Sequence, residues 1–308
     1  MNYSPIALFT YNRADHTQQA VESLLKNAEA KETDVFIFSD GPKNEKAVEG
    51  VKTNREYIRT ISGFKTVTII EREKNWGLSK NLIEGITRIC NEYGRVIVVE
   101  DDLILSPFFL RYMNDGLEKY KDDDRVASIS AFLNPVEGKI PETFFLRYFA
   151  CWGWATWKRA WDLLNIDSRD LLKKIRWKKN DFNIGGTGPF YGILYCDKVG
   201  LNDSWAVRFY ASCFLAGKLH LFPHHTMAIQ TGMDGSGTHS MAGGKNPYQY
   251  MALSDKPVLI DDIRVEENKD MYKAFSRFYC GEADRSTLKN LYCRFKSFIR
   301  RLIGLDYK

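Results

Sequence analysis

The chain has 308 residues, of which 44% are hydrophobic and 27% charged, and its formal net charge is +5. This composition can bury a sizeable core and excludes a disordered chain or a collagen-like fibre. No apolar run reaches the roughly 20 residues of a membrane-spanning helix. Strand-like sequence follows Met1 almost at once, so no signal peptide is expected. The sequence therefore predicts a cytoplasmic globular protein.

The first half of the chain alternates strand-like and helix-like segments. Its apolar runs are residues 6–10, 35–38, 67–70 and 96–99. The intervening segments include amphipathic stretches at 14–28 and 78–90, and a helix that reaches residue 61. Strands without alternating polarity, separated by helices, predict a mostly parallel sheet covered on both faces. Right-handed crossovers place the carboxyl ends of these strands on one edge, where such sheets bind ligands.

From Cys151 onward the sequence is richer in aromatic residues and glycine, with long irregular stretches such as 184–190 and 233–246. Loops of this kind favour a region that shapes a substrate site over a second independent core. The tryptophans at 152, 154 and 157 could stack on sugars, but core packing is the better interpretation for at least two of them. We predict one continuous domain over residues 1–284 and a tail at 285–308.

Six widely separated cysteines contain no C-x-x-C pair, which argues against a zinc or iron–sulfur site. We expect reduced and mostly buried thiols. The histidines at 220, 224 and 225 lie near a predicted strand without zinc-site spacing, so structural roles are expected.

Three consecutive carboxylates, Glu100, Asp101 and Asp102, follow the apolar run 96–99 directly. They would repel one another in an ordinary turn, and a divalent cation or a basic ligand removes that cost. A solvated acidic turn before a helix is the plainer alternative. The position at the end of a central parallel strand favours the functional interpretation.

The motifs around this triplet carry a family resemblance. The chain reads Asn-Trp-Gly-Leu at 75–78, Val-Val-Glu-Asp-Asp-Leu at 98–103 and Ser-Pro-Phe-Phe at 106–109. This pattern resembles the nucleotide-sugar core of GT-A glycosyltransferases, and more narrowly the N-acetylglucosaminyltransferase I family in a bacterial-type form. The resemblance is clearest over residues 5–131 and continues more loosely to about residue 240.

The resemblance implies an α/β GT-A fold that binds a UDP-sugar across the strand ends, in a nucleotide-sugar half (1–131) and an acceptor half (132–284). Asp102 resembles the residue that holds Mn²⁺ or Mg²⁺. Glu100 and Asp101 resemble residues that orient ribose, base and donor sugar, and Arg13 and Asp40 resemble uracil-facing residues. The implied activity is metal-dependent, inverting transfer from UDP-GlcNAc or another UDP-hexose.

Inverting transfer needs a base that takes the acceptor proton. Asn-Asp-Ser-Trp at 202–205 resembles the family's acid–acid–Trp motif, and Asp203 is the implied base, although Ser204 replaces the usual second acid. Alternatively, Asp203 caps the helix-like run 205–215. The segment 232–240 resembles a late loop that closes over the diphosphate, where His239 could donate to phosphate or to the metal shell. An ordinary surface loop is the alternative there.

Two other functions are the alternatives. A nucleotidyltransferase acting on sugar phosphates usually has a Gly-rich basic loop after the first strand, and residues 10–15 contain no glycine. A non-catalytic carbohydrate-binding protein would have no need of Asp102 and Asp203 together. Nucleic-acid binding is not expected, since residues 285–305 alone carry six basic residues and no acid, which leaves the remaining chain near neutral.

The tail combines this charge with an apolar stripe of residues 288, 291, 292, 295, 298, 299, 302 and 303. Such a basic amphipathic helix is typical of a membrane interface, although docking on the domain is the alternative. We expect peripheral attachment to the cytoplasmic face of an anionic membrane. There the enzyme would meet a glycan or lipid-linked saccharide acceptor of surface polysaccharide synthesis.

Overall fold

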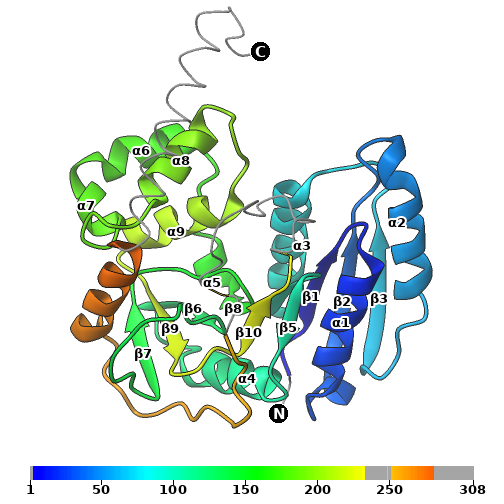
Figure 1. The fold of residues 1–308 in the computed structure, drawn as a ribbon, viewed down its shortest axis with the longest axis horizontal. Coiled ribbons are helices and arrows are strands. Elements are labelled where there is room, and N and C mark those ends of the chain that lie inside the picture. The colour runs from blue at the N-terminus through cyan, green and yellow to red at the C-terminus, as the bar shows by residue number, and fades with distance from the viewer. Residues whose placement is uncertain (1–2, 233–247, 249–250, 281–308) are drawn as a thin grey trace, which may run out of the picture.

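The computed structural model describes residues 3–232, 248 and 251–280. Its main sheet contains β1 (Ile6–Thr10), β2 (Asp34–Ser39), β3 (Thr66–Glu71), β4 (Arg95–Glu100), β6 (Val126–Ser130), β7 (Thr143–Leu146), β8 (Trp154–Trp157) and β9 (Leu219–Pro223). Their order is β3-β2-β1-β4-β8-β6-β9-β7 (Figure 1). The pairs among β1, β2, β3 and β4 are parallel, whereas β8 runs antiparallel to both β4 and β6. The mostly parallel sheet predicted for the first half is confirmed.

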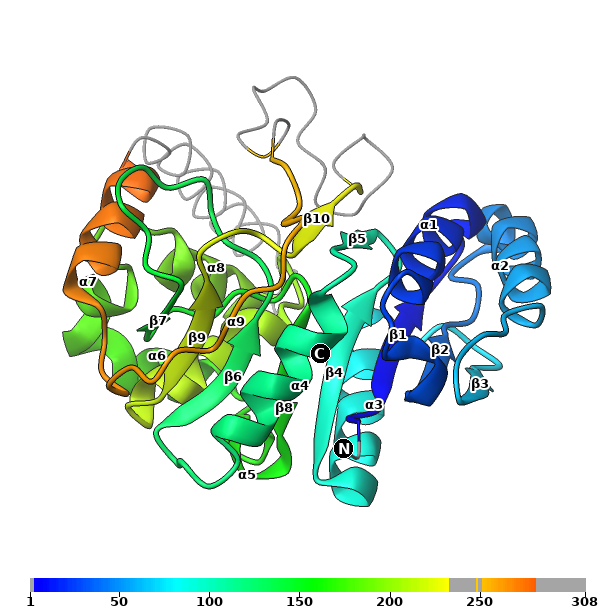
Figure 2. The ribbon, with the colours of Figure 1, turned by 90° about the horizontal axis from the view of Figure 1, so that it is seen from below.

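Helices cover both faces of this sheet (Figure 2). The labelled helices are α1 (Ala14–Leu25), α2 (Glu45–Ile58), α3 (Leu78–Tyr93), α4 (Phe109–Lys119), α5 (Lys158–Trp161), α6 (Ser168–Ile175), α7 (Lys179–Phe182), α8 (Phe190–Lys198) and α9 (Trp205–Leu215), with short 3₁₀ turns η1 (Ala30–Glu32) and η2 (Arg176–Lys178). Residues 269–280 are helical as well. The core beneath α1 and α4 contains alternate residues of β1, such as Ile6 and Leu8. The core beneath α3, α5, α6 and α9 contains the other alternates, Ala7 and Phe9. Burial on both faces explains why these strands show no polar alternation.

The N-terminal helices end near their predicted boundaries for local reasons. Residues 14–28 were expected to be helical, but α1 stops at Leu25 because Asn27 turns back, donating its side-chain amide to the Ser23 carbonyl at 3.1 Å. Helix α3 ends at Gly94, which has a φ of 76° and donates its N–H to the Cys90 carbonyl at 2.9 Å. That left-handed conformation favours glycine.

The second half is more regular than the loop-rich prediction. Helices α5 to α9 share one core with α3, and β6 to β9 extend the same sheet. Trp154 is fully buried and stacks on Trp205 with ring centroids 5.6 Å apart. Trp157 is also buried, whereas Trp152 is half-buried, which confirms core packing for two of the three tryptophans. The aromatic residues of the second half, which the sequence analysis assigned to loops, therefore pack in a core between the helices and the sheet.

His220 and the described cysteines behave as structural residues. His220 is fully buried, its Nδ1 lies 2.7 Å from Ser128 Oγ, and burial lowers its pKa to about 3. None of the described cysteines forms a disulfide; Cys90, Cys196 and Cys213 are buried, Cys151 is half-buried, and Cys280 is exposed.

A second, two-stranded sheet lies beside the end of β4. It pairs β5 (Leu103–Leu105) with β10 (Ala228–Gln230) in antiparallel register, so that Gln230 faces Leu103 across the pair (Figure 2). This pairing brings residues 230–232 next to the acidic triplet. None of the helices in the described part of the chain combines the length and apolarity required to cross a membrane.

Candidate active site

The acidic triplet is a continuation of the sheet and not a free turn. Glu100 is the last residue of β4 and lies opposite Phe9 of β1. The Asp101 N–H donates to the Phe9 carbonyl at 3.0 Å, which extends the pairing by one residue. The triplet is therefore fixed at the carboxyl edge of the parallel strands, where the sequence predicted it.

Arg13, at the start of α1, lies between two of these carboxylates. Its Nη2 is 2.6 Å from Asp101 Oδ1 and 3.0 Å from Asp102 Oδ2. The Tyr11 backbone N–H donates to the other Asp101 oxygen at 3.2 Å. Arg13 Nη1 is buried and has no hydrogen-bond partner within the described residues. Arg13 and the three carboxylates of the triplet, all predicted site residues, thus lie together. Arg13 Nη1 is the hydrogen-bond donor that can serve a ligand.

The site carries more negative charge than Arg13 offsets. Burial, followed by the charges of Asp102 and Asp101, raises the pKa of Glu100 to about 8. Burial also raises the pKa of Asp101 to about 6, against the opposing effect of Arg13. Three carboxylates in a poorly solvated position favour an additional cation.

Residues 230–232, at the end of β10, cover Asp102. Gln230 and Thr231 were not among the predicted site residues, because nothing in the sequence pattern indicates this contact. The Gln230 amide donates to Asp102 Oδ2 at 3.3 Å. The Thr231 N–H and hydroxyl both donate to the Asp102 carbonyl, at 2.8 and 3.0 Å. A Cβ on Gly232 would overlap Asp102 Oδ2 and lie 2.9 Å from Arg13 Nη1. Glycine at 232 therefore lets the chain pass directly over the carboxylate.

The donor set fits a cation that is shared with a phosphate ligand. Within the described residues, no three His, Cys, Asp or Glu side chains are arranged to enclose a metal. Magnesium-type ions in nucleotide enzymes are commonly held by one or two carboxylates plus substrate phosphates, without a full protein cage. The hydrogen bonds that Asp102 accepts from described side chains, from Arg13 and Gln230, both fall on Oδ2. Asp102 Oδ1 is the oxygen suited to a metal.

Asp40 lies at the end of β2 and holds the loop before α3. Its two carboxylate oxygens accept four hydrogen bonds, from the N–H groups of residues 41, 76 and 77 and from the Asn75 amide, at 2.8–3.0 Å. A carboxylate has about four acceptor positions, and these contacts use them. The expected contact between Asp40 and the uracil base stays a prediction. The hydrogen bonds show that Asp40 positions the Asn75–Gly77 loop.

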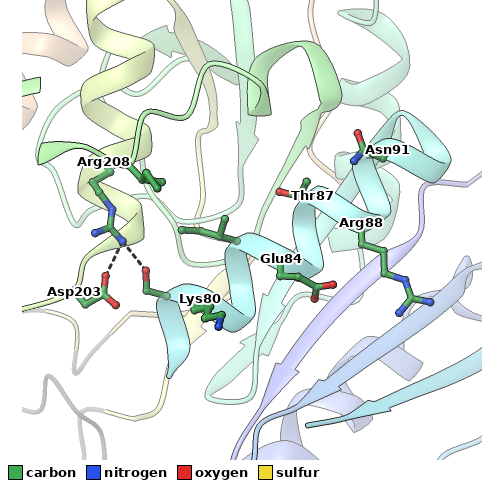
Figure 3. A pocket seen from close by; sticks show the side chains of 10 residues that line it. Lys80, Glu84, Thr87, Arg88, Asn91, Asp203 and Arg208 are labelled. Atoms are coloured by element: carbon green, nitrogen blue, oxygen red, sulfur yellow. Dashed lines mark hydrogen bonds and ion pairs between the residues drawn. The ribbon is translucent and has the colours of Figure 1, made fainter. Parts of the chain in front are cut away.

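Asp203 lines a cleft whose lining residues do not include the triplet. The cleft has a volume of about 710 Å³ and lies against the outer face of α3, from Ser79 to Asn91, with Ile166 and Arg208 in its lining (Figure 3). The Asp203 side chain is 68% exposed and accepts from Arg208 Nη2 at 2.7 Å. The alternative role of Asp203 as the cap of α9 is wrong, because the cap is Ser204, whose hydroxyl accepts from the Val207 N–H at 3.4 Å.

Arg208 joins Asp203 to the first half of the molecule. Its Nη2 also donates to Ser79 Oγ, in the first turn of α3, at 2.6 Å. Its Nη1 pairs with Asp197 at 3.1 Å, and the Asp197 side chain is only 3% exposed. Arg208 was not among the predicted site residues, because its partners lie up to 129 positions away in the sequence. His239 lies outside the described residues, as does most of the predicted loop 232–240.

With this geometry in place, the chain can be compared with known proteins. Residues 6–186, more than half of the chain, match the family described as Glycosyl transferase family 2. The chain belongs to this family. The α/β fold with its large, mostly parallel sheet agrees with the GT-A glycosyltransferase architecture, and the protein is a glycosyltransferase by family. No curated protein matches the chain in sequence.

Solved structures give distant likenesses to this family 2 glycosyltransferase. One is the mannosyltransferase PcManGT from Pyrobaculum calidifontis in complex with GDP-Man and Mn²⁺, at 10% identity and a TM-score of 0.39, with 69% of this chain and 70% of that chain covered. Another is a UDP-glucose pyrophosphorylase complexed with UDP-glucose, at 10% identity and a TM-score of 0.37, with 71% and 90% covered. Both TM-scores lie below 0.5, so neither likeness extends beyond a general similarity of fold.

Proposed function

We propose that this glycosyltransferase is a metal-dependent, inverting enzyme that transfers a sugar from UDP-GlcNAc or another UDP-hexose to a saccharide acceptor. The observation that carries the proposal is the triplet Glu100–Asp102 at the end of β4, in which Asp101 and Asp102 pair with Arg13 and Gly232 lies against Asp102. The narrower likeness to the N-acetylglucosaminyltransferase I family belongs to this proposal and rests on the motifs at 75–78, 98–103 and 106–109.

The strand-end site suits the donor. Asp102 would hold Mn²⁺ or Mg²⁺ against the diphosphate, and the ion when bound supplies positive charge that stabilises the leaving group. The buried Arg13 Nη1 has no partner in the described region and can donate to an oxygen of the donor. Glu100 and Asp101 would orient the ribose, base or sugar. His239, outside the described residues, stays a proposed phosphate-side residue.

The cleft at Asp203 suits the acceptor. The Asp203 carboxylate would take the proton of the attacking acceptor hydroxyl. The acceptor oxygen then forms a bond to the anomeric carbon as the bond from that carbon to the diphosphate breaks, and the nucleoside diphosphate leaves. Arg208 fixes the position of the carboxylate, whose exposed remainder faces the cleft (Figure 3).

The described loop between β1 and α1 argues against a sugar-phosphate nucleotidyltransferase. Those enzymes need a glycine-rich basic loop there, whereas residues 11–13 are Tyr-Asn-Arg and Arg13 is already paired with two carboxylates. A non-catalytic carbohydrate-binding protein would need neither the exposed Asp203 carboxylate in its cleft nor the charged triplet at the end of β4, and this chain has both.

A panel of nucleotide sugars with and without Mn²⁺ tests the proposal. We expect one UDP-hexose to raise the melting temperature only with the metal, and to be hydrolysed slowly without acceptor. Equal stabilisation by UDP, GDP and CDP sugars, or none with metal, would contradict the donor assignment. The anomeric configuration of a product, read by NMR, tests inversion.

Within this proposal, the enzyme acts at the cytoplasmic face of a membrane on a lipid-linked saccharide of a surface polysaccharide. The support is the tail at 285–308, which combines basic residues with an apolar stripe in its sequence and lies outside the described residues. A chain that ends at Asp284 should lose part of its salt-sensitive binding to anionic vesicles. Equal binding of the two chains would assign the tail to another role.

A further inference from the structure

The turn that follows α6 presents a tryptophan to solvent. Residues 176–180 are all exposed, and Trp177 is 84% exposed, the highest value among the large hydrophobic side chains of the described residues. Tryptophan is normally largely buried, so a large exposed indole is informative. No role in the proposed sugar transfer uses this side chain.

The exposure of Trp177 comes from a turn that is anchored on both sides. Ile175 before it and Phe182 after it are fully buried. Phe182 stacks on Tyr210 with ring centroids 4.6 Å apart, and the Tyr210 hydroxyl donates to the Phe182 carbonyl at 2.8 Å. The intervening η2 turn has no buried residue. The fold therefore holds the indole outward instead of leaving it on a loose segment.

Basic residues surround the indole. The segment 169–181 contains six Lys or Arg and two Asp, a local net charge of +4 in a chain of +5. Lys174 pairs with Asp170 at 2.6 Å, and the Arg176 guanidinium lies 4.8 Å from the centre of the Trp177 ring. Lys173 and Lys178 are exposed. We call Lys173, Arg176, Trp177 and Lys178 the basic tryptophan turn.

We propose that the basic tryptophan turn binds the surface of an anionic membrane, independently of the tail. Indole rings are favoured at the headgroup level, where an apolar ring and a polar N–H are both accommodated. Lysines and arginines beside it add attraction to anionic lipids. A soluble polyanion would need the charges but would gain little from one projecting indole without a neighbouring ring to form a stacking platform.

The turn lies at one end of the molecule, in the layer of α6 to α9. Helix α2 and strand β3 lie at the opposite end (Figure 1). Exposed lysines on α2, Lys46 and Lys52, therefore offer a matched control that removes the same charge far from the turn.

The test uses the full chain and vesicles of phosphatidylcholine with or without phosphatidylglycerol. Trp177→Ala should lower the partition onto anionic vesicles roughly 10-fold, the loss expected for one large apolar side chain. Lys173→Gln with Lys178→Gln should lower it about 25-fold at low salt, roughly fivefold for each charge. Lys46→Gln with Lys52→Gln should change it less than about threefold, because α2 lies at the opposite end of the molecule from the turn.

A spectroscopic readout separates insertion of the indole from general attraction. Brominated lipids should quench part of the fluorescence of the seven tryptophans, and Trp177→Phe should remove that quenching while the other six stay bright. Hydrolysis of the donor in solution should be the same in all these variants, which keeps this test separate from the proposed function.

Three outcomes would overturn the proposal. Equal vesicle binding by wild type and Trp177→Ala would assign membrane attachment elsewhere. Binding of double-stranded DNA that depends on the lysines, without vesicle binding, would make the turn a polyanion site. Self-association that Trp177→Ala abolishes, again without vesicle binding, would make it a contact between copies of the chain.

Discussion

The strand-end site and the cleft at Asp203 hold their carboxylates in different ways. Asp102 is 15% exposed and lies beside Glu100 and Asp101 at the end of β4. Arg13 pairs with both Asp101 and Asp102. Asp203 is 68% exposed and contacts one arginine, whose own side chain is 11% exposed and fixed by Asp197 and Ser79. The first arrangement concentrates negative charge that a cation can offset. The second presents a single accessible carboxylate that can accept a proton.

This difference means that changes at the two places should separate donor binding from turnover. Loss of charge at the strand end should affect affinity for metal and donor. Loss of charge at the cleft should affect the chemical step alone.

The largest effect is expected for Asp102→Ala. Metal-dependent binding of the UDP-sugar should be lost by more than the roughly 10–100-fold that an outer-shell partner of a metal site costs. Titration calorimetry with and without Mn²⁺ measures it, and circular dichroism checks the fold. Asp122→Ala, an exposed acid on the loop before β6, is the control and should leave affinity unchanged. Unchanged donor affinity in Asp102→Ala would remove the metal role from this residue.

The next effect is expected for Asp203→Asn. Turnover should fall at least ~10²-fold with little change in donor affinity, as the loss of a general base requires. Steady-state kinetics and donor titration on the same preparation measure the two quantities. Asp262→Asn, another exposed acid with a lysine partner at 2.7 Å, serves as control. Turnover within a few-fold of wild type would move the base elsewhere, with Asp234 and the acids of 162–170 next.

A smaller effect is expected for Gly232→Ala. The added methyl group would overlap Asp102 Oδ2, so the carboxylate must turn away from its position beside Arg13. Misplacement of a binding group should weaken metal-dependent donor affinity roughly 10-fold. Since Gly232 is next to the strand-end site and not to the cleft, turnover at saturating donor should change less. The reverse pattern would contradict the division between the two sites.

The smallest effect is expected for Ser204→Ala. Its hydroxyl caps α9, so the free energy of unfolding should fall by about 1 kcal/mol. Asp203→Asn should leave it unchanged, because Asp203 is not the cap. Urea unfolding of both variants compares them directly. Equal destabilisation by the two changes would show that Asp203 supports the helix after all.

The sequence by itself determined the elements of the first half and the position of the triplet. Strands β1 to β4 lie within one residue of the predicted apolar runs. For β1, β2 and β4 the reason is that residues buried on both faces of a parallel sheet must be continuously apolar. Asp40 follows β2 directly and Arg13 follows β1 after two residues. The resemblance to GT-A glycosyltransferases, and not the strand pattern alone, singled out these two residues.

Only the tertiary structure decided which distant residues complete these sites. Gln230 reaches Asp102 across 128 residues through the pairing of β5 and β10, and Arg208 reaches Ser79 across 129. The sequence favoured neither contact, because neither a strand of three residues nor a lone arginine carries a pattern. The aromatic second half likewise suggested loops, whereas burial against the sheet made it a layer of helices. Patterns along the chain report on local periodicity, but contacts between distant segments depend on how the whole core packs.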